Sequence, residues 1–148
     1  EVTVLSRGTA KKDQALKTLG AHSFVDTTDA AAVKAATESF DMIIDTISAQ
    51  HDCNLYLSMC DVDGKLVLVG ASPEDLGFGP FNIIARRKSV VGSMIGGIRE
   101  TQDMLDFSGK HNITCDIEMV TADQIDVAYE RTIKSDVRFR FVIDTATI

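Results

Sequence analysis

Short runs of apolar residues alternate along the chain with longer amphipathic stretches. The apolar runs are rich in Val and Ile and are bounded by turn-forming residues, which is typical of strands. The predicted strands cover residues 1–5, 22–27, 40–46, 65–70 and 88–93. Helical spacing of apolar residues predicts helices between and after them, at 11–19, 29–38, 50–60, 81–86 and 100–110. This order predicts an α/β fold, in which helices cover both faces of a parallel sheet.

The last third of the chain continues the pattern less regularly. Residues 115–120 and 136–144 look extended, and a helix is predicted between them at 122–133. The loop at 70–80 holds both prolines and three of the ten glycines, but it lies within the alternation. We interpret it as a βα loop and not as a domain boundary. The 148 residues, without repeat or linker, are therefore expected to form one domain.

Composition and charge narrow the classes of partner. The chain has 45% hydrophobic and 25% charged residues, which is ordinary for a globular protein. Its 15 basic and 22 acidic residues give a net charge of −7, so we expect no broad binding to nucleic acid or to anionic membranes. No apolar run approaches the roughly 18 residues of a membrane span, and residues 1–5 lack the basic start of a signal peptide. We expect a soluble, cytoplasmic protein.

The cysteines and histidines do not form a recognisable ligand pattern. Cys53, Cys60 and Cys115 are neither an even set nor a CxxC pair, so neither a disulfide framework nor a zinc knuckle is indicated. The spacing of seven between the first two would place them on one helical face, which favours the core. His22, His51 and His111 are scattered without ligand spacing to cysteine. We interpret them as surface or capping residues and predict no metal site.

Candidate chemistry begins at the end of the first predicted strand. Ligands of open parallel sheets bind outside the carboxyl ends of the strands. Here Ser6 and Arg7 follow the strand, Lys11 opens the next helix, and no acid stands at the strand end. Dinucleotide folds that select NAD usually place an acid there for the ribose hydroxyls, whereas a 2′-phosphate favours cations. These residues suit a 2′-phosphate, although a solvated loop would have the same composition.

Small residues follow the other strands. They include Thr46 after the third strand, Gly70 and Ala71 after the fourth, and the stretch 94–97 after the fifth. Small residues allow a flat ring or a phosphate to approach the backbone, although each stretch taken alone is also consistent with an ordinary turn. Their occurrence at successive strand ends favours a ligand site along this edge.

The glycine-rich phosphate loop of a dinucleotide fold is not present in the sequence. Such a loop, GxGxxG, precedes the second strand's ribose-binding end by roughly 20 residues. Only five residues precede Ser6, and the stretch 92–97 reads GSMIGG, which does not match. If residues 1–5 are the second strand, the sheet is incomplete at its amino end, without its first strand, phosphate loop and first helix.

Several blocks of the sequence resemble a known enzyme family. These are residues 1–27, 40–72, 86–113 and 123–144, and the block GSMIGGIRETQDMLDF at 92–107 is the most specific. Together they resemble zinc-dependent medium-chain alcohol dehydrogenases, nearest to the NADP-dependent cinnamyl alcohol dehydrogenase branch. The resemblance covers essentially the whole chain. It implies that residues 1–148 are most of a Rossmann-like NADP(H)-binding domain, with 136–148 returning toward a catalytic domain.

The resemblance also implies roles for individual residues. The 2′-phosphate of NADP would be held by Ser6, Arg7 and Lys11, although many relatives have a small hydroxyl residue in place of Arg7. Thr46 would face the central region of the cofactor, and Arg138 would reach the pyrophosphate. The nicotinamide end would be met by backbone at Val69, Gly70, Ala71, Ser93, Met94 and Ile95. Such backbone contacts fix the face that delivers hydride.

The catalytic zinc of this family belongs to an amino-terminal domain that these 148 residues do not contain. There the zinc would polarise the carbonyl while NADPH supplies hydride. We therefore expect zinc not to be bound by this chain, and the chain to act on aldehydes and primary alcohols only with its catalytic domain as partner. In isolation it is predicted to be inactive.

The family's strand order, 3-2-1-4-5-6, implies open edges where the first strand is missing. Either a second copy pairs across the gap, giving a homo-oligomer, or the flanking strands become neighbours. The alternative function is an oligomerisation module that has lost cofactor binding. A methyltransferase-like doubly wound domain would also show the alternation, but it would not explain the family blocks.

Overall fold

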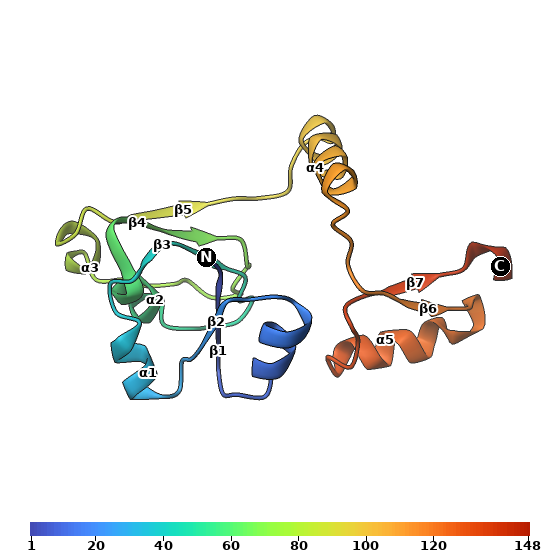
Figure 1. The fold of residues 1–148 in the computed structure, drawn as a ribbon, viewed down its shortest axis with the longest axis horizontal. Helices are drawn as coiled ribbons and strands as arrows, with labels where there is room; N and C mark the ends of the chain where they lie inside the picture. Colours follow the sequence, from blue (N-terminus) through green and yellow to red (C-terminus); the bar gives the residue numbers. More distant parts are fainter. The chain divides into compact units, whose positions relative to one another are not determined.

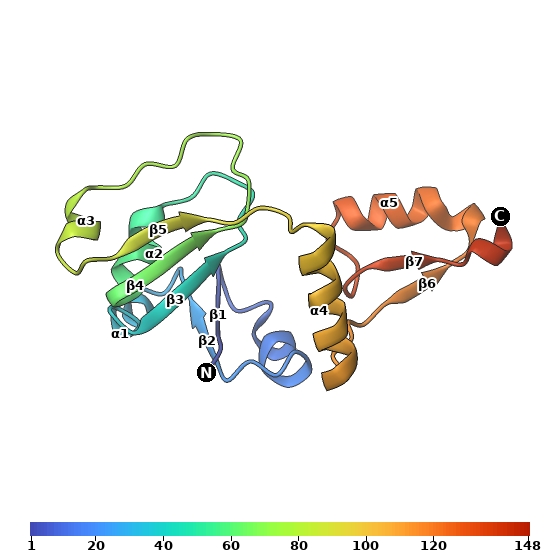
Figure 2. The ribbon, with the colours of Figure 1, turned by 90° about the horizontal axis from the view of Figure 1, so that it is seen from above.

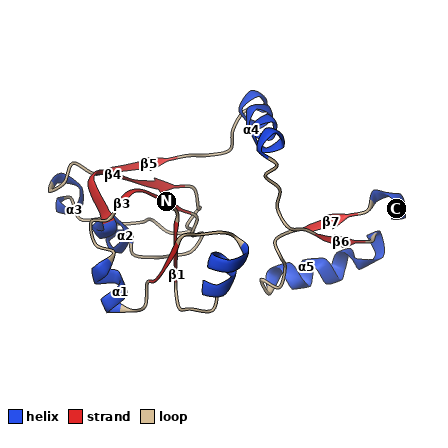
Figure 3. Cartoon of the chain, in the orientation of Figure 1, coloured by secondary structure: helices blue, strands red, loops and turns tan.

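The computed structural model covers residues 1–148 and consists of two compact units, Glu1–Ile95 and Gly96–Ile148. The sequence predicted one domain, and the division falls just after the fifth predicted strand. No linker rich in Pro or Ser marks it. Figures 1 and 2 show the chain in two orientations, and Figure 3 shows its helices and strands.

The strands of the first unit form two separate parallel sheets. The two-stranded sheet consists of β1 (Thr3–Ser6) and β2 (Ser23–Asp26). The other sheet has the order β3–β4–β5 and consists of β3 (Phe40–Asp45), β4 (Cys60–Leu68) and β5 (Ser89–Gly92). Every pair is parallel, which confirms the predicted α/β class. β4 begins five residues earlier than predicted, because Cys60 pairs with Phe40 before a shift in register.

Short helices connect these strands. They are a π-helical turn (Gln14–Thr18), α1 (Ala30–Ala35), α2 (Cys53–Met59) and α3 (Phe81–Ile84). Asp29 and Asp52 cap α1 and α2, since each carboxylate accepts a hydrogen bond from a backbone N–H two residues further along. The segment 70–80 lies between β4 and α3, which confirms the predicted βα loop.

No strand pairing joins β1 to β3, so each presents an unpaired edge. The expectation that the strands flanking the gap become neighbours is therefore wrong. Side chains from both elements instead line the space between them, as described below. The sheet order β2–β1, gap, β3–β4–β5 is that of a doubly wound sheet without its central strand.

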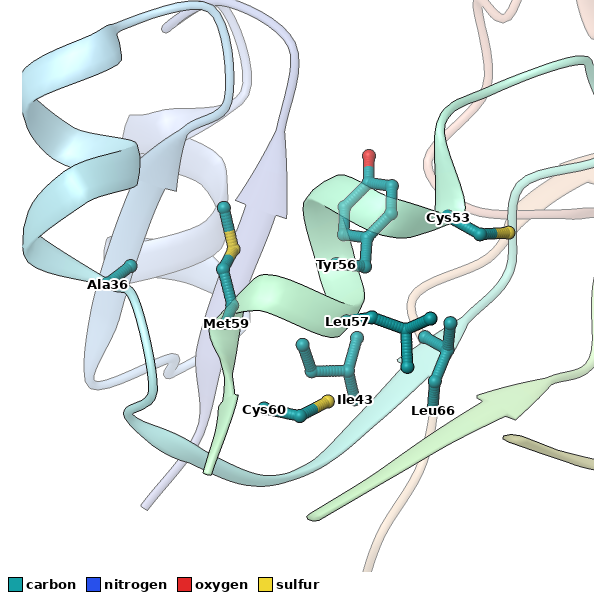
Figure 4. Packing of buried hydrophobic residues seen from close by; sticks show 8 residues of the cluster. All are labelled: Ala36, Ile43, Cys53, Tyr56, Leu57, Met59, Cys60 and Leu66. Carbon is teal, nitrogen blue, oxygen red and sulfur yellow. The ribbon is translucent and has the colours of Figure 1, made fainter. Parts of the chain in front are cut away.

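The core of the first unit lies between α2 and the three-stranded sheet. Ile43, Leu57 and Leu66 converge there, and Leu57 and Leu66 are fully buried (Figure 4). Cys53 and Cys60 are also buried, as predicted, although Cys60 begins β4 and does not belong to the helix. Lys88 enters this core as a charged residue, and its Nζ donates to the Leu57 carbonyl at 2.6 Å.

The second unit is a βαβ arrangement preceded by a helix. It contains α4 (Ile98–His111), β6 (Glu118–Val120), α5 (Ile125–Ile133) and β7 (Phe141–Ile143). β6 and β7 are parallel and α5 connects them, which confirms the predicted strand, helix and strand order. None of the helices in the chain combines the length and the hydrophobicity needed to cross a membrane.

Candidate functional site

The turn after β1 is built around the carboxylate of Asp26. Its Oδ1 accepts hydrogen bonds from the backbone N–H of Gly8 at 2.8 Å and from the backbone N–H and hydroxyl of Thr28 at 2.9 and 2.7 Å. These bonds, led by the one from the Thr28 hydroxyl, lower the pKa of Asp26. Gly8 has φ +72°, a conformation that favours glycine. The turn therefore has a fixed shape at the strand end where the sequence placed the phosphate site.

The three residues predicted to hold a 2′-phosphate lie on this β1 connection. Ser6 is the last residue of β1 and is half-buried, and its carbonyl accepts from the backbone N–H of Thr27 at 2.9 Å. Arg7 and Lys11 follow it, and both are exposed. Neither cation is paired with a carboxylate within the chain.

The other predicted contacts lie at the carboxyl ends of β3, β4 and β5. The backbone N–H groups of Val69 and Gly70 both donate to the Asp45 carbonyl, at 2.9 and 3.0 Å. Ser93 donates in the same way to Leu68. Thr46, Val69–Ala71 and Ser93–Ile95 therefore follow three neighbouring strands of one sheet. Met94 and Ile95 are about 90% exposed, which leaves an apolar surface at this edge.

Gly70 owes its place at this edge to packing within the chain. A Cβ atom there would lie 2.4 Å from the carbonyl oxygen of Ile47 and 2.6 Å from the carbonyl carbon of Thr46. No side chain fits between these backbones. The sequence prediction linked the small residue to approach by a ligand, but the structure gives it a second and sufficient reason.

Arg138 lies in the second unit. Its guanidinium donates to the carbonyls of Val137 and Ser135, at 3.0 and 3.5 Å, and its backbone N–H donates to Glu118. The contact with a pyrophosphate therefore stays a prediction.

A cavity of about 430 Å³ separates the unpaired edges of β1 and β3. Val2–Leu5 line one side, Met42–Ile47 line the other, and Tyr56 closes it. Burial, followed by the charge of Asp45, raises the pKa of the Tyr56 hydroxyl. A second cavity, of about 650 Å³, also reaches β1 and β3 and extends to α1. The gap in the sheet is thus accompanied by hollows lined by both flanking strands.

The structure also brings together three residues that the sequence did not connect. His51 Nε2 lies 2.6 Å from Asp45 Oδ2 and 3.7 Å from Cys53 Sγ. The interpretation of His51 as a surface or capping residue is wrong, because its side chain is only 9% exposed and Asp52 caps α2. His22 and His111 are exposed, as predicted. Burial, followed by the charges of Asp45 and Asp52, raises the pKa of the Cys53 thiol.

Comparison with known proteins identifies the family. Residues 1–110 match the model of the zinc-binding dehydrogenases. The chain belongs to this family. Among curated zinc-binding dehydrogenases and their relatives, a probable formaldehyde dehydrogenase of Bacillus subtilis is 50% identical over 148 residues, which are all of this chain and 42% of that protein. Cinnamyl alcohol dehydrogenase 7 of Arabidopsis thaliana is 49% identical over 146 residues, 99% of this chain and 41% of the relative.

Solved structures of dehydrogenases agree with the fold. A cinnamyl alcohol dehydrogenase of Sorghum bicolor superposes with a TM-score of 0.91 at 45% identity, covering 98% of this chain and 41% of its own. The structure of CAD from Helicobacter pylori in complex with NADP(H) superposes with a TM-score of 0.79 at 39% identity. The match covers 99% of this chain and 41% of the other. The resemblance and the Rossmann-like α/β fold are therefore confirmed. The chain spans about two fifths of the length of these relatives.

Proposed function

We propose that this chain is most of the NADP(H)-binding domain of a zinc-binding dehydrogenase that interconverts aldehydes and primary alcohols. The observation that carries the proposal is the pair of exposed, unpaired cations, Arg7 and Lys11, on the connection that follows β1. The names of the relatives, which are alcohol, formaldehyde and cinnamyl alcohol dehydrogenases, support the reaction class.

The 2′-phosphate is held by side chains in this proposal. The backbone N–H of Gly8 could otherwise donate to a phosphate, but it already donates to Asp26. Two cations on the same connection offset the charge of a phosphate and donate charge-assisted hydrogen bonds to it. The Ser6 hydroxyl adds a neutral partner. Selection for NADP over NAD then depends mainly on Arg7 and Lys11.

The nicotinamide end of the cofactor lies along the carboxyl edge of the three-stranded sheet in this proposal. Thr46 faces the middle of the cofactor, and backbone groups of Val69–Ala71 and Ser93–Ile95 hold the carboxamide. When bound, the nicotinamide supplies or accepts the hydride of the reaction. This chain orients the ring, and its exposed Met94 and Ile95 limit access of water to one side of it.

In the whole protein, an extended segment fills the gap between β1 and β3. Its occupant, in our proposal, comes from the three fifths of the relatives' length that this chain does not match. Both flanking strands offer unpaired backbone groups, and the cavity between them has apolar lining from Val2, Val4 and Ile43. The same unmatched part carries the catalytic domain, so this chain alone has no dehydrogenase activity.

The 2′-phosphate site is tested with fragments of the cofactor. Adenosine 2′,5′-bisphosphate and adenosine 5′-monophosphate are titrated into the 15N-labelled chain, and amide shifts are followed by NMR. We expect saturable binding of the bisphosphate, with shifts at Ser6 and Gly8, and weaker binding of the monophosphate. Arg7→Glu is expected to weaken binding of the bisphosphate by about tenfold or more, since a charged hydrogen bond is lost.

Lys34→Glu is the matched control. Lys34 is exposed on α1 and has no carboxylate partner, so this variant makes the same change of charge away from the turn. If both variants weakened binding of the bisphosphate equally, the effect would come from the net charge of the chain, which would contradict the proposed subsite. Absence of binding at millimolar bisphosphate, with a stable oligomer seen by light scattering, would favour the oligomerisation module instead.

The gap is tested separately with synthetic peptides that tile the unmatched part of the Bacillus subtilis relative. One peptide is expected to protect amides of β1 and β3 from hydrogen exchange. Protection of these amides only through self-association of the chain would show that a second copy fills the gap.

A further inference from the structure

We propose that Asp45, His51 and Cys53 form a binding site for Zn²⁺ at the carboxyl end of β3. A carboxylate oxygen, an imidazole nitrogen and a thiol sulfur converge there, and the three atoms lie within 4.8 Å of one another. No other group of three or more potential ligands of this kind is present in the chain. The proposal is independent of NADP binding, because none of the three residues belongs to the proposed cofactor contacts.

The orientation of His51 is the first observation that supports the site, because it directs Nε2 to the other two donor atoms. Its Nδ1 lies 2.7 Å from the carbonyl oxygen of Ala49, which can only accept, so Nδ1 carries a proton. Its Nε2 lies 2.6 Å from Asp45 Oδ2, which is also an acceptor. In the neutral ring, the lone pair of Nε2 would face the carboxylate. At this distance the two groups share a proton, and Zn²⁺ would bind by replacing that proton at Nε2.

The contact with Ala49 is also the arrangement found around metal-binding histidines. Such a histidine donates its other ring N–H to a carbonyl or carboxylate, which fixes the tautomer and the ring plane. Tyr56 packs edge-on against the same ring, with the centroids 5.8 Å apart. Nε2 is thereby held in place before any ion binds.

Asp45 and Cys53 are held by regular structure. Asp45 ends β3, and its Oδ1 accepts from the backbone N–H of Ile47 at 2.9 Å, which directs Oδ2 to His51. Cys53 is the first residue of α2 and is only 1% exposed. Ligands on strand and helix ends keep their positions better than ligands on free loops.

The donor set favours zinc among divalent ions. One thiolate, one imidazole and one carboxylate form a borderline-soft set, whereas Mg²⁺ and Ca²⁺ prefer oxygen ligands. Tetrahedral zinc holds its ligand atoms about 3.5 Å apart. The 3.7 Å between His51 and Cys53 already fits this spacing, and Asp45 must withdraw by about 1 Å or less from His51 to match it.

Charge is conserved when the ion binds. Zn²⁺, a neutral imidazole, a carboxylate and a thiolate sum to zero, so the occupied site carries no net charge. Two protons, one from Nε2 and one from Sγ, are released to solvent. In the 148-residue chain, whose gap between β1 and β3 is unfilled, the ion reaches the site from the cavity lined by Asp45 and Tyr56, and water from that side takes the fourth coordination position.

The test uses Co²⁺ as a spectroscopic probe for Zn²⁺. The reduced 148-residue chain is titrated with Co²⁺ and followed by absorption. We expect one equivalent to give a near-ultraviolet thiolate-to-cobalt band and visible bands of a four-coordinate ion, both removed by stoichiometric Zn²⁺. Cys53→Ser is expected to abolish the near-ultraviolet band, and His51→Gln to weaken Zn²⁺ binding about 100-fold or more, as befits the loss of a ligand.

Two controls separate this site from other thiols and from misfolding. Cys115→Ser removes the exposed cysteine and is expected to leave both bands unchanged. The circular dichroism of each variant shows whether it is folded, and His51→Gln, which leaves Cys53 in place, covers the case in which Cys53→Ser does not fold. A chain that gives no thiolate band, or one that loses it in Cys115→Ser and keeps it in Cys53→Ser, overturns the proposal. The contact between His51 and Asp45 would then be a hydrogen bond only.

Discussion

The two units of this chain differ in what holds them together. The first has a continuous apolar cluster in which Leu57, Met59 and Leu66 are fully buried. The second has a single buried apolar residue, Ala128. Its interactions centre instead on Arg131, which donates to Glu118 at 2.7 Å and to Asp136 at 3.0 Å.

The difference shows that alternation of strands and helices does not by itself make a core. Both units contain parallel strands joined through a helix, but only the first buries apolar side chains from three elements together. In the second, Arg131 also lies over the ring of Phe141, 4.7 Å from its centroid, and so joins α5 to β7. The first unit should therefore respond most to lost apolar volume, and the second to lost charge.

The largest effect is expected from truncation of the apolar cluster. Leu57→Ala should lower the free energy of unfolding of the first unit by about 2–5 kcal/mol, because it removes apolar volume from a fully buried site. Urea unfolding followed by NMR at amides of each unit measures this. Leu105→Ala, the same change on α4 at 54% exposure, should cost less than about 0.5 kcal/mol. Similar losses of stability in the two variants would contradict the proposed difference between the two units.

Overpacking at the strand ends should have the next largest effect. Gly70→Ala forces a Cβ against the carbonyl of Ile47 and should cost about 1–3 kcal/mol in the same urea experiment. Gly92→Ala at the end of β5 is the control, since a Cβ there meets no atom within 4 Å. If Gly70→Ala proved as harmless as the control, the close approach of Gly70 to the backbone at Thr46 and Ile47 would be wrong.

In the second unit, Arg131→Ala should increase hydrogen exchange at β6 and β7 and leave β3 and β4 unchanged. The loss of stability should be smaller than that of Gly70→Ala, because half-exposed ion pairs contribute little. Arg140→Ala is the control, since Arg140 forms no ion pair. It should leave hydrogen exchange unchanged in both units. Equal effects of the two arginine variants would mean that the Arg131 contacts add nothing.

The smallest effect concerns pH. The hydrogen bond from Arg131 lowers the pKa of Glu118 in the folded chain, so the unfolded chain binds its proton first as the pH falls. The stabilisation is complete above the unfolded pKa of about 4.3 and is lost as the pH falls through the lower folded value. NMR from pH 7 to 3 should show the loss at β6. Glu118→Gln should abolish this pH dependence, whereas Glu130→Gln should leave it unchanged.

The strands were predictable because each is a local apolar run between turn residues. All of the predicted strands are present. Where a strand begins and ends depends on pairing with a neighbouring strand, which the local sequence does not show: β4 begins at Cys60 because Cys60 pairs with Phe40. The predicted helix at 11–19 is present at 12–18, but Gln14–Thr18 have the wider π-helical turn. The division into two units falls within GSMIGG at 92–97, whose glycines we interpreted as part of a ligand site and not as a boundary.

The strand-end residues of the candidate site were predictable from topology, because carboxyl ends of neighbouring parallel strands share an edge. The cluster of Asp45, His51 and Cys53 was not predictable in this way. It joins a strand end, a loop and a helix start, and only the turn at Ile47 brings them together. A carboxylate six residues before a histidine, with a cysteine two further on, was the only signal.

The open edges of β1 and β3 also affect how the isolated chain can be handled. Each edge is a row of free amide and carbonyl groups, which is the usual template for aggregation. Solubility of the purified chain will therefore be limited by intermolecular sheet growth at concentrations where its core is still intact. Charged or proline substitutions along Val2–Leu5 would be the first step in making it suitable for long measurements.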